Sequence, residues 1–267
     1  MSVFKVLFHD DDRYVSMEGG DDSEKKPEPP VKKDRFPSSF SNGQGLGMIF
    51  GVSTFPIIGM LFHPTYLMMN SKLLGSVKPD PALCSGADAS SKIECVPAAT
   101  YLAAFGIGSS TMGITMLSVG ITMIIGLTNI VPQAFGSGNL KLCGAYANRM
   151  MIIVALTLGV VAILTELFVD KLLGLLNLDP WTLKFACEYY RVVLPGCYIS
   201  MLQMPYTNLA SSFGRTKFGF YSTASASVIH WLLAYNMVDL FESKMMGISI
   251  ATMIHFLLRA LVGFLCI

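Results

Sequence analysis

Six long apolar stretches constrain this sequence more than any other feature. A bilayer core of about 30 Å requires about 20 apolar residues from each α-helix that crosses it. Transmembrane β-strands would instead require alternating polar residues, and residues 150–164 are apolar on every side of a helix. The sequence therefore predicts an all-α fold, a polytopic membrane helical bundle with about six transmembrane helices. The helices are expected at residues 45–70, 98–131, 144–168, 180–212, 217–239 and 245–267.

Charged residues are concentrated in the first 43 positions, which hold 16 of the 37 Asp, Glu, Lys and Arg side chains. Only 14% of the chain is charged and 52% is apolar, whereas roughly 25% of an ordinary globular domain is charged. Between Asp10 and Ser41, prolines and charges of both signs leave too little apolar surface to offset the entropy of folding. We expect a disordered cytoplasmic tail at residues 1–43 and a six-helix membrane lobe at residues 44–267.

Lysine and arginine residues near the helix ends favour one orientation in the membrane. The tail is rich in them, and two short turns carry Lys141 with Arg149 and Arg215 with Lys217. These positions fall on one side of a six-helix bundle, while the lysines of the other side are interspersed with acidic residues. We expect a multi-pass protein of the plasma membrane or an endomembrane, with both termini in the cytoplasm.

Several classes of function lack their chemical basis in this sequence. With a net charge of +1, the chain has no excess of basic side chains to neutralise the phosphates of a nucleic acid. The six cysteines form neither a CxxC pair nor a cysteine–histidine cluster, so no metal site and no cofactor is expected. No Ser-His-Asp order or phosphate loop indicates an enzyme. Cys84 and Cys95 share the one long polar loop, where they either form a disulfide or remain two free thiols.

The second apolar stretch is too long for one straight span. Its 34 residues would extend about 50 Å as a helix, so we expect it to tilt, bend or protrude. Gly106, Gly113 and Gly120 recur along it every seven residues. This spacing predicts one stripe of glycines against which another helix packs closely.

The junction after this stretch contains the most specific motif. Residues 126–139 read Gly-Leu-Thr-Asn-Ile-Val-Pro-Gln-Ala-Phe-Gly-Ser-Gly-Asn. This junction resembles the turn between the second and third helices of the multidrug and toxic compound extrusion (MATE) family, which has Gln-Ala-Tyr/Phe-Gly-Ala-Gly-Asn and then an arginine. The residues that match are Gln133, Ala134, Phe135, Gly136, Gly138, Asn139 and Arg149. We expect Gly136 and Gly138 to permit a tight turn with φ > 0.

Three further stretches are similar to the same family in order and spacing, around residues 190–196, 209–216 and 247–251. The resemblance covers residues 45–267 and implies one of the two six-helix lobes of a transporter, with the substrate cavity between the lobes. Antiporters of this family use intramembrane carboxylates for ion coupling. Residues 45–70 contain neither Asp nor Glu, so the coupling chemistry departs from the family pattern.

The resemblance implies a secondary active transporter, an antiporter that exports small organic compounds or other xenobiotics against a proton or sodium gradient. Because the sequence holds one lobe, we expect either a half-length or truncated form of a longer protein, or a half that pairs with a second lobe or as a homodimer. The alternative is a non-transporting membrane subunit or regulator of a larger assembly. The bilayer, a small organic substrate and the coupling ion are the expected partners.

Four polar residues inside the apolar stretches are candidates for the substrate pathway. His63, Asn129 and Gln133 are expected to line a cavity, and Arg259 is expected to contact an anion or a partner carboxylate. Each also has a structural interpretation. His63 would be a satisfied buried histidine, the two amides would form interhelical hydrogen bonds, and Arg259 would extend to the headgroups.

Other polar residues are expected to be structural. His230 and Asn236 are interpreted as packing residues. Glu188 and Arg191 lie three positions apart on one helix face, which predicts an ion pair at headgroup level.

Overall fold

The computed structural model describes residues 42–78, 96–240 and 243–265, and every regular element in these ranges is helical. The six predicted apolar stretches become six successive helical segments; the fourth has the predicted bounds, and the other five differ from theirs by a few residues at one or both ends. An all-α membrane bundle of about six helices is therefore confirmed. The elements are α2 (Asn42–Gly75), α3 (Ala98–Met112), the π-helix η3 (Gly113–Leu117), α4 (Ser118–Gly136), α5 (Leu140–Gly174), α6 (Pro180–Ser212), α7 (Lys217–Tyr235), the π-helix η4 (Asn236–Leu240) and α8 (Lys244–Leu265).

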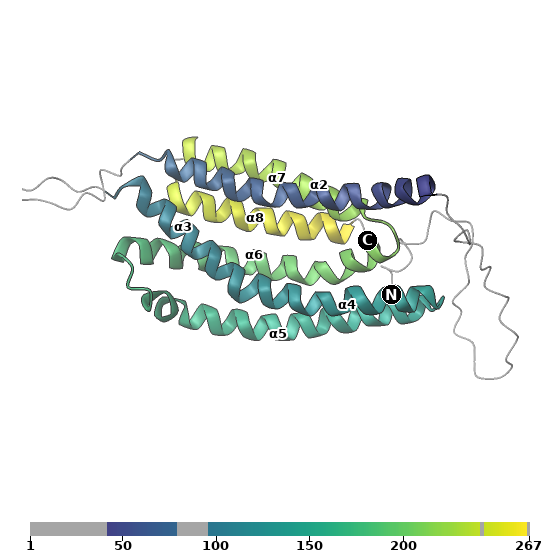
Figure 1. The fold of residues 1–267 in the computed structure, drawn as a ribbon. Helices are drawn as coiled ribbons and strands as arrows, with labels where there is room; N and C mark the ends of the chain where they lie inside the picture. Colours follow the sequence, from purple (N-terminus) through teal and green to yellow (C-terminus); the bar gives the residue numbers. More distant parts are fainter. Residues whose placement is uncertain (1–41, 79–95, 241–242, 266–267) are drawn as a thin grey trace, which may run out of the picture.

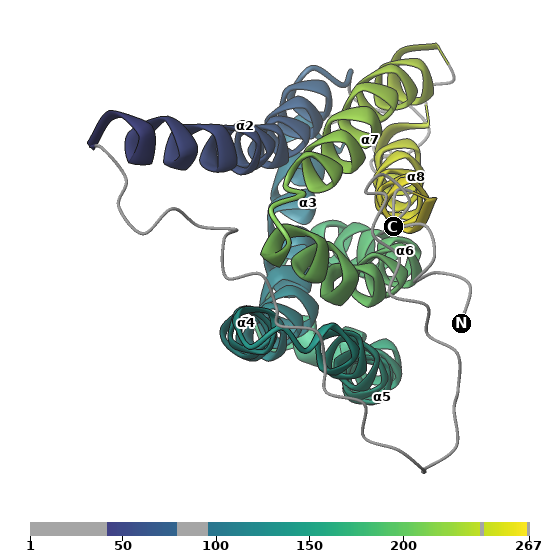
Figure 2. The same cartoon turned by 90° about the vertical axis from the view of Figure 1, so that its right-hand side faces the viewer.

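The helices lie side by side, with their connecting turns at two ends of the bundle (Figure 1). The α4–α5 turn and the α6–α7 turn share one end with the start of α2 and the last turn of α8. Seen along the bundle, the first turns of α2 point away from the other helices (Figure 2). Helix α2 exposes large apolar side chains along its length, among them Phe50, Met60 and Leu61.

Three segments are long and apolar enough to cross a bilayer by themselves, namely Ala98–Gly136, Leu140–Gly174 and Lys244–Leu265. Helix α6 is less apolar because it is surrounded by protein, packing against α3, α4, α5 and α8. It buries the polar side chains of Ser200 and Gln203 among these neighbours. A helix in the middle of a bundle need not present an apolar face to lipid on all sides.

The long second stretch bends at a π-helix. Figure 1 shows α3 and α4 running in different directions on either side of η3. The hydroxyl of Ser118, the first residue of α4, donates to the backbone oxygen of Gly113 in η3 at 2.9 Å. Within η3, Thr115 Oγ1 lies 2.9 Å from the hydroxyl of Tyr190 in α6. A π-helical turn inserts one extra residue into the α-helical repeat, which bends the helix and rotates the faces beyond it.

The predicted glycine stripe is wrong for two of its three members. Gly120 does pack closely, since a Cβ there would lie 3.0 Å from Met201 Sδ, but Gly106 and Gly113 face open space. The close approach in α3 is at Gly108, where a Cβ would lie 2.8 Å from Tyr189 Cδ1. The π-helix between Gly108 and Gly120 shifts the helical phase, so a seven-residue repeat no longer stays on one face.

Candidate functional site

The motif at the end of α4 forms a Schellman turn. The N–H of Asn139 donates to Ala134 O at 3.1 Å, and the N–H of Gly138 donates to Phe135 O at 2.9 Å. Gly138 has φ +79°, the left-handed conformation that this turn requires and that glycine adopts without steric cost. Asn139 then caps α5, since its Oδ1 accepts from the N–H of Leu142 at 3.0 Å.

The α6–α7 connection repeats this geometry. The N–H of Arg215 donates to Ala210 O at 3.0 Å, the N–H of Gly214 donates to Ser211 O at 2.9 Å, and Gly214 has φ +78°. The two turns touch, because the rings of Phe135 and Phe213 lie 5.0 Å apart. The prediction of a positive φ is correct for Gly138 and wrong for Gly136, which is the last residue of α4.

A polar stripe lies on the exposed side of α4. Asn129 and Gln133 are one helical turn apart and both are exposed, and neither side chain forms a hydrogen bond with a described residue. Thr122 lies two turns before Asn129 on the same side and is also exposed. Within the described helices neither amide forms an interhelical hydrogen bond, because both face away from the other five helices. Arg149 is exposed near the start of α5.

Arg259 borders a small polar cavity at the end of α8. The cavity has a volume of about 90 Å³, and Arg259 is partly buried there. The hydroxyl of Ser222 donates to the backbone oxygen of Arg259 at 2.6 Å, and Gln203 Nε2 donates to Thr207 Oγ1. Within the described ranges no carboxylate pairs with Arg259, whose charge is the only formal charge on the cavity wall. The lining residues are Gln203, Met204, Thr207, Asn208, Gly219, Ser222, Thr223 and Arg259.

Sequence reasoning missed a buried polar network between α2, α7 and α8. His230 Nε2 lies 2.9 Å from Asn70 Oδ1, and His230 Nδ1 lies 3.1 Å from the backbone oxygen of Ala251. Asn70 Nδ2 donates to Thr252 Oγ1 at 3.2 Å. Asn70, His230 and Thr252 are fully buried. Asn70 closes the first apolar stretch, and an amide in such a stretch is the signal that would have found the network.

Two aromatic groups enclose this network. The ring of Tyr66 stacks on that of His255 at 4.9 Å between centroids and meets His230 edge-on at 5.7 Å. His255 also lies 5.4 Å from His230. The interpretation of His230 as a simple packing residue is therefore incomplete, since both ring nitrogens have polar partners.

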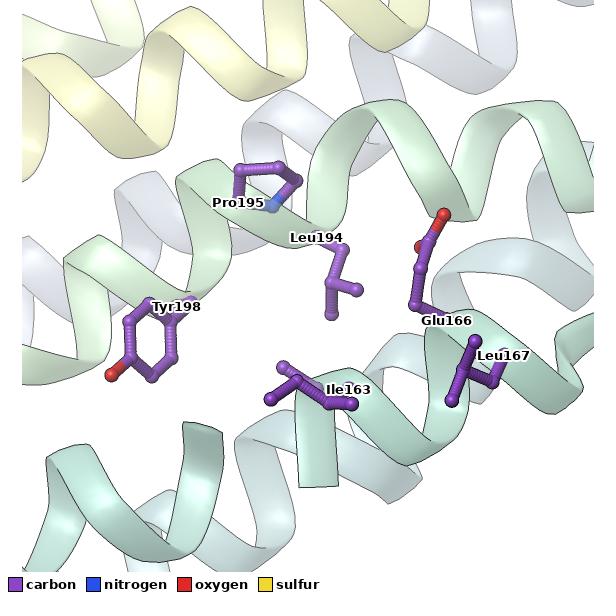
Figure 3. Close-up of a pocket in the computed structure, with 7 residues that line it drawn as sticks. Ile163, Glu166, Leu167, Leu194, Pro195 and Tyr198 are labelled. Atoms are coloured by element: carbon purple, nitrogen blue, oxygen red, sulfur yellow. The ribbon is translucent and has the colours of Figure 1, made fainter. Parts of the chain in front are cut away.

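A groove between α5 and α6 is the larger cavity of the two, at about 300 Å³ (Figure 3). Ile163, Glu166 and Leu167 from α5 lie across it from Leu194, Pro195 and Tyr198 of α6. Its walls are apolar except for Glu166 and Tyr198.

The ion pair predicted for Arg191 with Glu188 is replaced by one between helices. Arg191 reaches from α6 to α5, where its Nη2 lies 2.6 Å from Asp170 Oδ2 and its Nε lies 3.6 Å from Glu166 Oε1. Glu166 and Asp170 are four residues apart on one face of α5, so a single guanidinium bridges both. This ionic cluster joins α5 to α6, and its Glu166 also lines the groove.

Comparison with known proteins identifies the family. A family model described as MatE matches residues 95–236, which is more than half of the chain. The chain belongs to the MATE family. Helices α3 to α7 and both Schellman turns lie within the matched part of this MATE protein.

Relatives and solved structures extend the similarity of this MATE chain to most of its helices. Protein DETOXIFICATION 7 of Arabidopsis thaliana is 29% identical over 140 residues, which cover 51% of this chain and 28% of that protein. Protein DETOXIFICATION 8 of the same plant is 29% identical over 140 residues, 51% of this chain and 29% of that protein.

Solved MATE structures share the fold. A transporter of the MOP superfamily from Pyrococcus furiosus aligns with a TM-score of 0.66 at 18% identity, covering 81% of this chain and 43% of that one. The bent form of the Vibrio cholerae MATE transporter VcmN aligns with a TM-score of 0.64 at 20% identity, covering 81% of this chain and 45% of that one. The MATE chain thus corresponds to less than half of each of these transporters.

Three predicted site residues of this MATE chain lie beyond what the structure describes. Cys84 and Cys95 fall in residues 79–95, so the disulfide remains a prediction. His63 lies in α2, but its side chain is not among the described ones. Of the remaining pathway candidates, Asn129 and Gln133 share one face of α4, and neither borders the cavity of Arg259.

Proposed function

We propose that this chain is one lobe of a secondary active transporter that exports small organic compounds in exchange for protons or sodium ions. The match of residues 95–236 to the MATE family carries the proposal. The solved MATE transporters aligned with this chain are more than twice as long as the part it covers, so we propose that a second lobe completes the substrate cavity. That lobe is supplied by the rest of a longer polypeptide, by a second copy of this chain or by a partner chain.

The exposed polar stripe of α4 supports a second lobe. An amide facing hydrocarbon is costly because lipid offers it no hydrogen-bond partner. Asn129 and Gln133 are exposed on the lobe and belong to one of the segments apolar enough to span the bilayer. We propose that they face the second lobe and line the cavity between the two.

Arg259 is proposed to attract negative charge toward that cavity. A partly buried cation in a small polar pocket is stabilised by an anionic partner, and the described helices supply no carboxylate to it. The partner would be a carboxylate of the second lobe or an acidic group of the substrate. His63 remains a proposed pathway residue on the grounds of its place in the first membrane helix.

The proposed domain arrangement follows the charge pattern. We propose a cytoplasmic tail at residues 1–43 and a membrane lobe at residues 44–267. The α4–α5 and α6–α7 turns carry the basic residues Lys141, Arg149, Arg215 and Lys217, so we place their end of the bundle in the cytoplasm. Ordered aromatic contacts between the two turns would hold this end together at the headgroup level.

Reconstituted transport tests the function. The purified chain is placed in proteoliposomes with an imposed pH gradient, and efflux of the fluorescent cation ethidium is followed. We expect gradient-dependent transport only in preparations where cross-linking shows dimers, or after the partner lobe is added. Arg259→Gln is expected to lower transport by tenfold or more, and Lys171→Gln, at an exposed cation of α5, serves as its matched control.

Two outcomes would contradict the proposal. Transport by a preparation that contains only monomers would show that one lobe suffices. A stable complex with another membrane protein, without transport in any assembly or gradient, would instead favour the alternative of a non-transporting subunit.

A further inference from the structure

The groove between α5 and α6 lies on the outside of the lobe. Helix α5 runs along the edge of the bundle (Figure 2), and Ile163 and Leu167 on its side of the groove are each more than half exposed. Leu194 and Pro195 of α6 form the opposite wall. The volume of about 300 Å³ is at the lower end of the range for ligand pockets. In a bilayer, an apolar groove on the outer surface of a helical bundle faces lipid.

Contacts between the two helices differ at the two ends of the groove. At one end the hydroxyl of Tyr198 donates to the backbone oxygen of Ala155 at 3.0 Å, so its polar atom is satisfied. At the other end Arg191 of α6 pairs with Asp170 and Glu166 of α5. Figure 3 shows Glu166 and Tyr198 toward opposite ends, with apolar side chains between them. The groove is therefore apolar along its length and ionic at one end.

Helix length places the ionic cluster at the depth of the lipid headgroups. Helices α5 and α6 have 35 and 33 residues and each extends about 50 Å, whereas the hydrocarbon core is about 30 Å thick. When the surplus is shared between both ends, about seven residues at each end lie outside the core. Counted back from Gly174, this boundary on α5 falls between Glu166 and Asp170. At the same end of the bundle, Lys184 Nζ lies 5.4 Å from the ring centroid of Trp181, a pair of residue types that is typical of the interface.

The cluster carries an excess of negative charge. Two carboxylates share one guanidinium, and the side chains of Glu166 and Asp170 are 44% and 60% exposed. Among the residues that the structure describes, no lysine pairs with either carboxylate, and the neighbouring Lys171 lies over the ring of Phe168 instead. An ionised carboxylate accepts about four hydrogen bonds. Both carboxylates therefore have capacity for a further cationic donor.

We propose that this groove binds phosphatidylethanolamine, with one acyl chain along the apolar walls and the ammonium group donating to Glu166 and Asp170. The headgroup carries both signs of charge, as the cluster does, and its phosphate accepts from the guanidinium of Arg191, which has five N–H donors. A primary ammonium donates three hydrogen bonds, whereas the quaternary ammonium of phosphatidylcholine donates none. An anionic headgroup would add negative charge where it is already in excess.

Quenching of tryptophan fluorescence by brominated lipids tests the site. In the full chain, Trp181 and Trp231 are replaced by phenylalanine and one reporter is introduced. Ile163→Trp lies in the groove, and Leu164→Trp, at the same depth and also exposed, lies outside it. In phosphatidylcholine bilayers, dibrominated phosphatidylethanolamine is expected to quench Ile163→Trp by a factor of about 2 to 5 more than its mole fraction predicts, the range for an exposed ion pair. At Leu164→Trp, quenching should follow the mole fraction.

Charge variants identify the headgroup contact. Glu166→Gln is expected to reduce the preference for phosphatidylethanolamine at Ile163→Trp, and its combination with Asp170→Asn is expected to abolish it. Glu166→Gln keeps the pair of Arg191 with Asp170 at 2.6 Å, and thermal unfolding checks that each variant is folded. Lys171→Gln, which removes a neighbouring cation, is the control and should not lower the preference.

Several results would overturn this inference. They are equal quenching at both reporters, the same preference for dibrominated phosphatidylcholine, and a preference that persists in the folded double variant. A second lobe that covers the groove would protect Ile163→Trp from every brominated lipid in cross-linked dimers. An organic cation that occupies the groove in preference to lipid would release the brominated lipid when tetraphenylphosphonium is added. Either of these results would also overturn the lipid site.

The lipid site and the proposed function can fail separately. Lipid binding requires neither an ion gradient nor a substrate. A preference for phosphatidylethanolamine at Ile163→Trp that depends on Glu166 and Asp170 therefore supports the lipid site even if no assembly of the chain transports ethidium. That lack of transport would overturn the proposed function alone.

Discussion

Single residues at the α4–α5 turn show how a short motif becomes a fixed geometry. The Gln-Ala-Phe-Gly-Ser-Gly-Asn sequence places glycine at the one position with a left-handed backbone, φ +79° at Gly138. The next residue, Asn139, caps the following helix. The left-handed glycine recurs at Gly214, without the Gln-Ala-Phe sequence before it and without a side chain that caps the next helix.

Replacing Gly138 by alanine tests the strain of this turn. We expect Gly138→Ala to destabilise the protein by about 1 to 2 kcal/mol, because a Cβ in the left-handed region contacts the following carbonyl. Gly136→Ala is the matched control, since Gly136 lacks a positive φ and a Cβ there meets no atom within 4 Å. Thermal unfolding in detergent would compare the two variants. Equal losses would mean that the turn is not held in the left-handed conformation.

At the scale of elements, α6 organises the lobe. It is flanked by α3, α4, α5 and α8, and it contacts them through close packing at glycines and through an ion pair. Glycines of α3 and α4 admit its side chains, and Gly196 of α6 itself admits the backbone of α8, with a Cβ at that position 2.8 Å from Met253 O. Arg191 adds an ionic link to α5. Larger residues in place of these glycines, or an apolar residue in place of Arg191, would therefore disturb the packing of α6 against its neighbours.

The contact between α3 and α6 gives a sharp prediction. Gly108→Ala is expected to lower stability by about 1 to 3 kcal/mol through overpacking. Its Cβ would lie 2.8 Å from Tyr189 Cδ1 and 3.2 Å from the backbone oxygen of Ala186. Gly106→Ala, two residues earlier and facing open space, is expected to be neutral or slightly stabilising. The melting temperatures of the two variants measure the difference, and a neutral Gly108→Ala would mean that α3 and α6 pack less closely.

For the whole molecule, alternation of the turns between two ends predicts which residues share a side of the membrane. Ser137 lies in the α4–α5 turn and Leu176 in the α5–α6 turn, and both are exposed. In sealed cells, a membrane-impermeant thiol reagent should label Leu176→Cys directly and Ser137→Cys only after permeabilisation. Cys84, Cys95 and Cys266 are first replaced by serine, and the remaining native Cys143, Cys187 and Cys197 are buried and give little background. Labelling of both variants from one side would contradict the topology, and the reverse pattern would invert the proposed orientation.

The sequence by itself determined the fold class and the family resemblance. Hydrophobic runs of sufficient length specify helices locally, because each backbone hydrogen bond within the bilayer must be satisfied inside its own segment. The Gln133–Asn139 motif likewise predicted a turn, since its geometry depends on neighbouring residues alone. The sequence did not indicate which of the glycines face a neighbouring helix, because one extra residue in η3 rotates every helix face beyond it.

Only the tertiary structure decided which polar groups meet. Asn70 and His230 are 160 positions apart and Asn70 and Thr252 are 182 apart, yet they share one buried network. Arg191 pairs with Asp170, 21 residues away on another helix, rather than with its neighbour Glu188. Helical periodicity shows which residues share a face, but not which helix packs against that face. Contacts between distant segments therefore depend on the packing of the whole bundle.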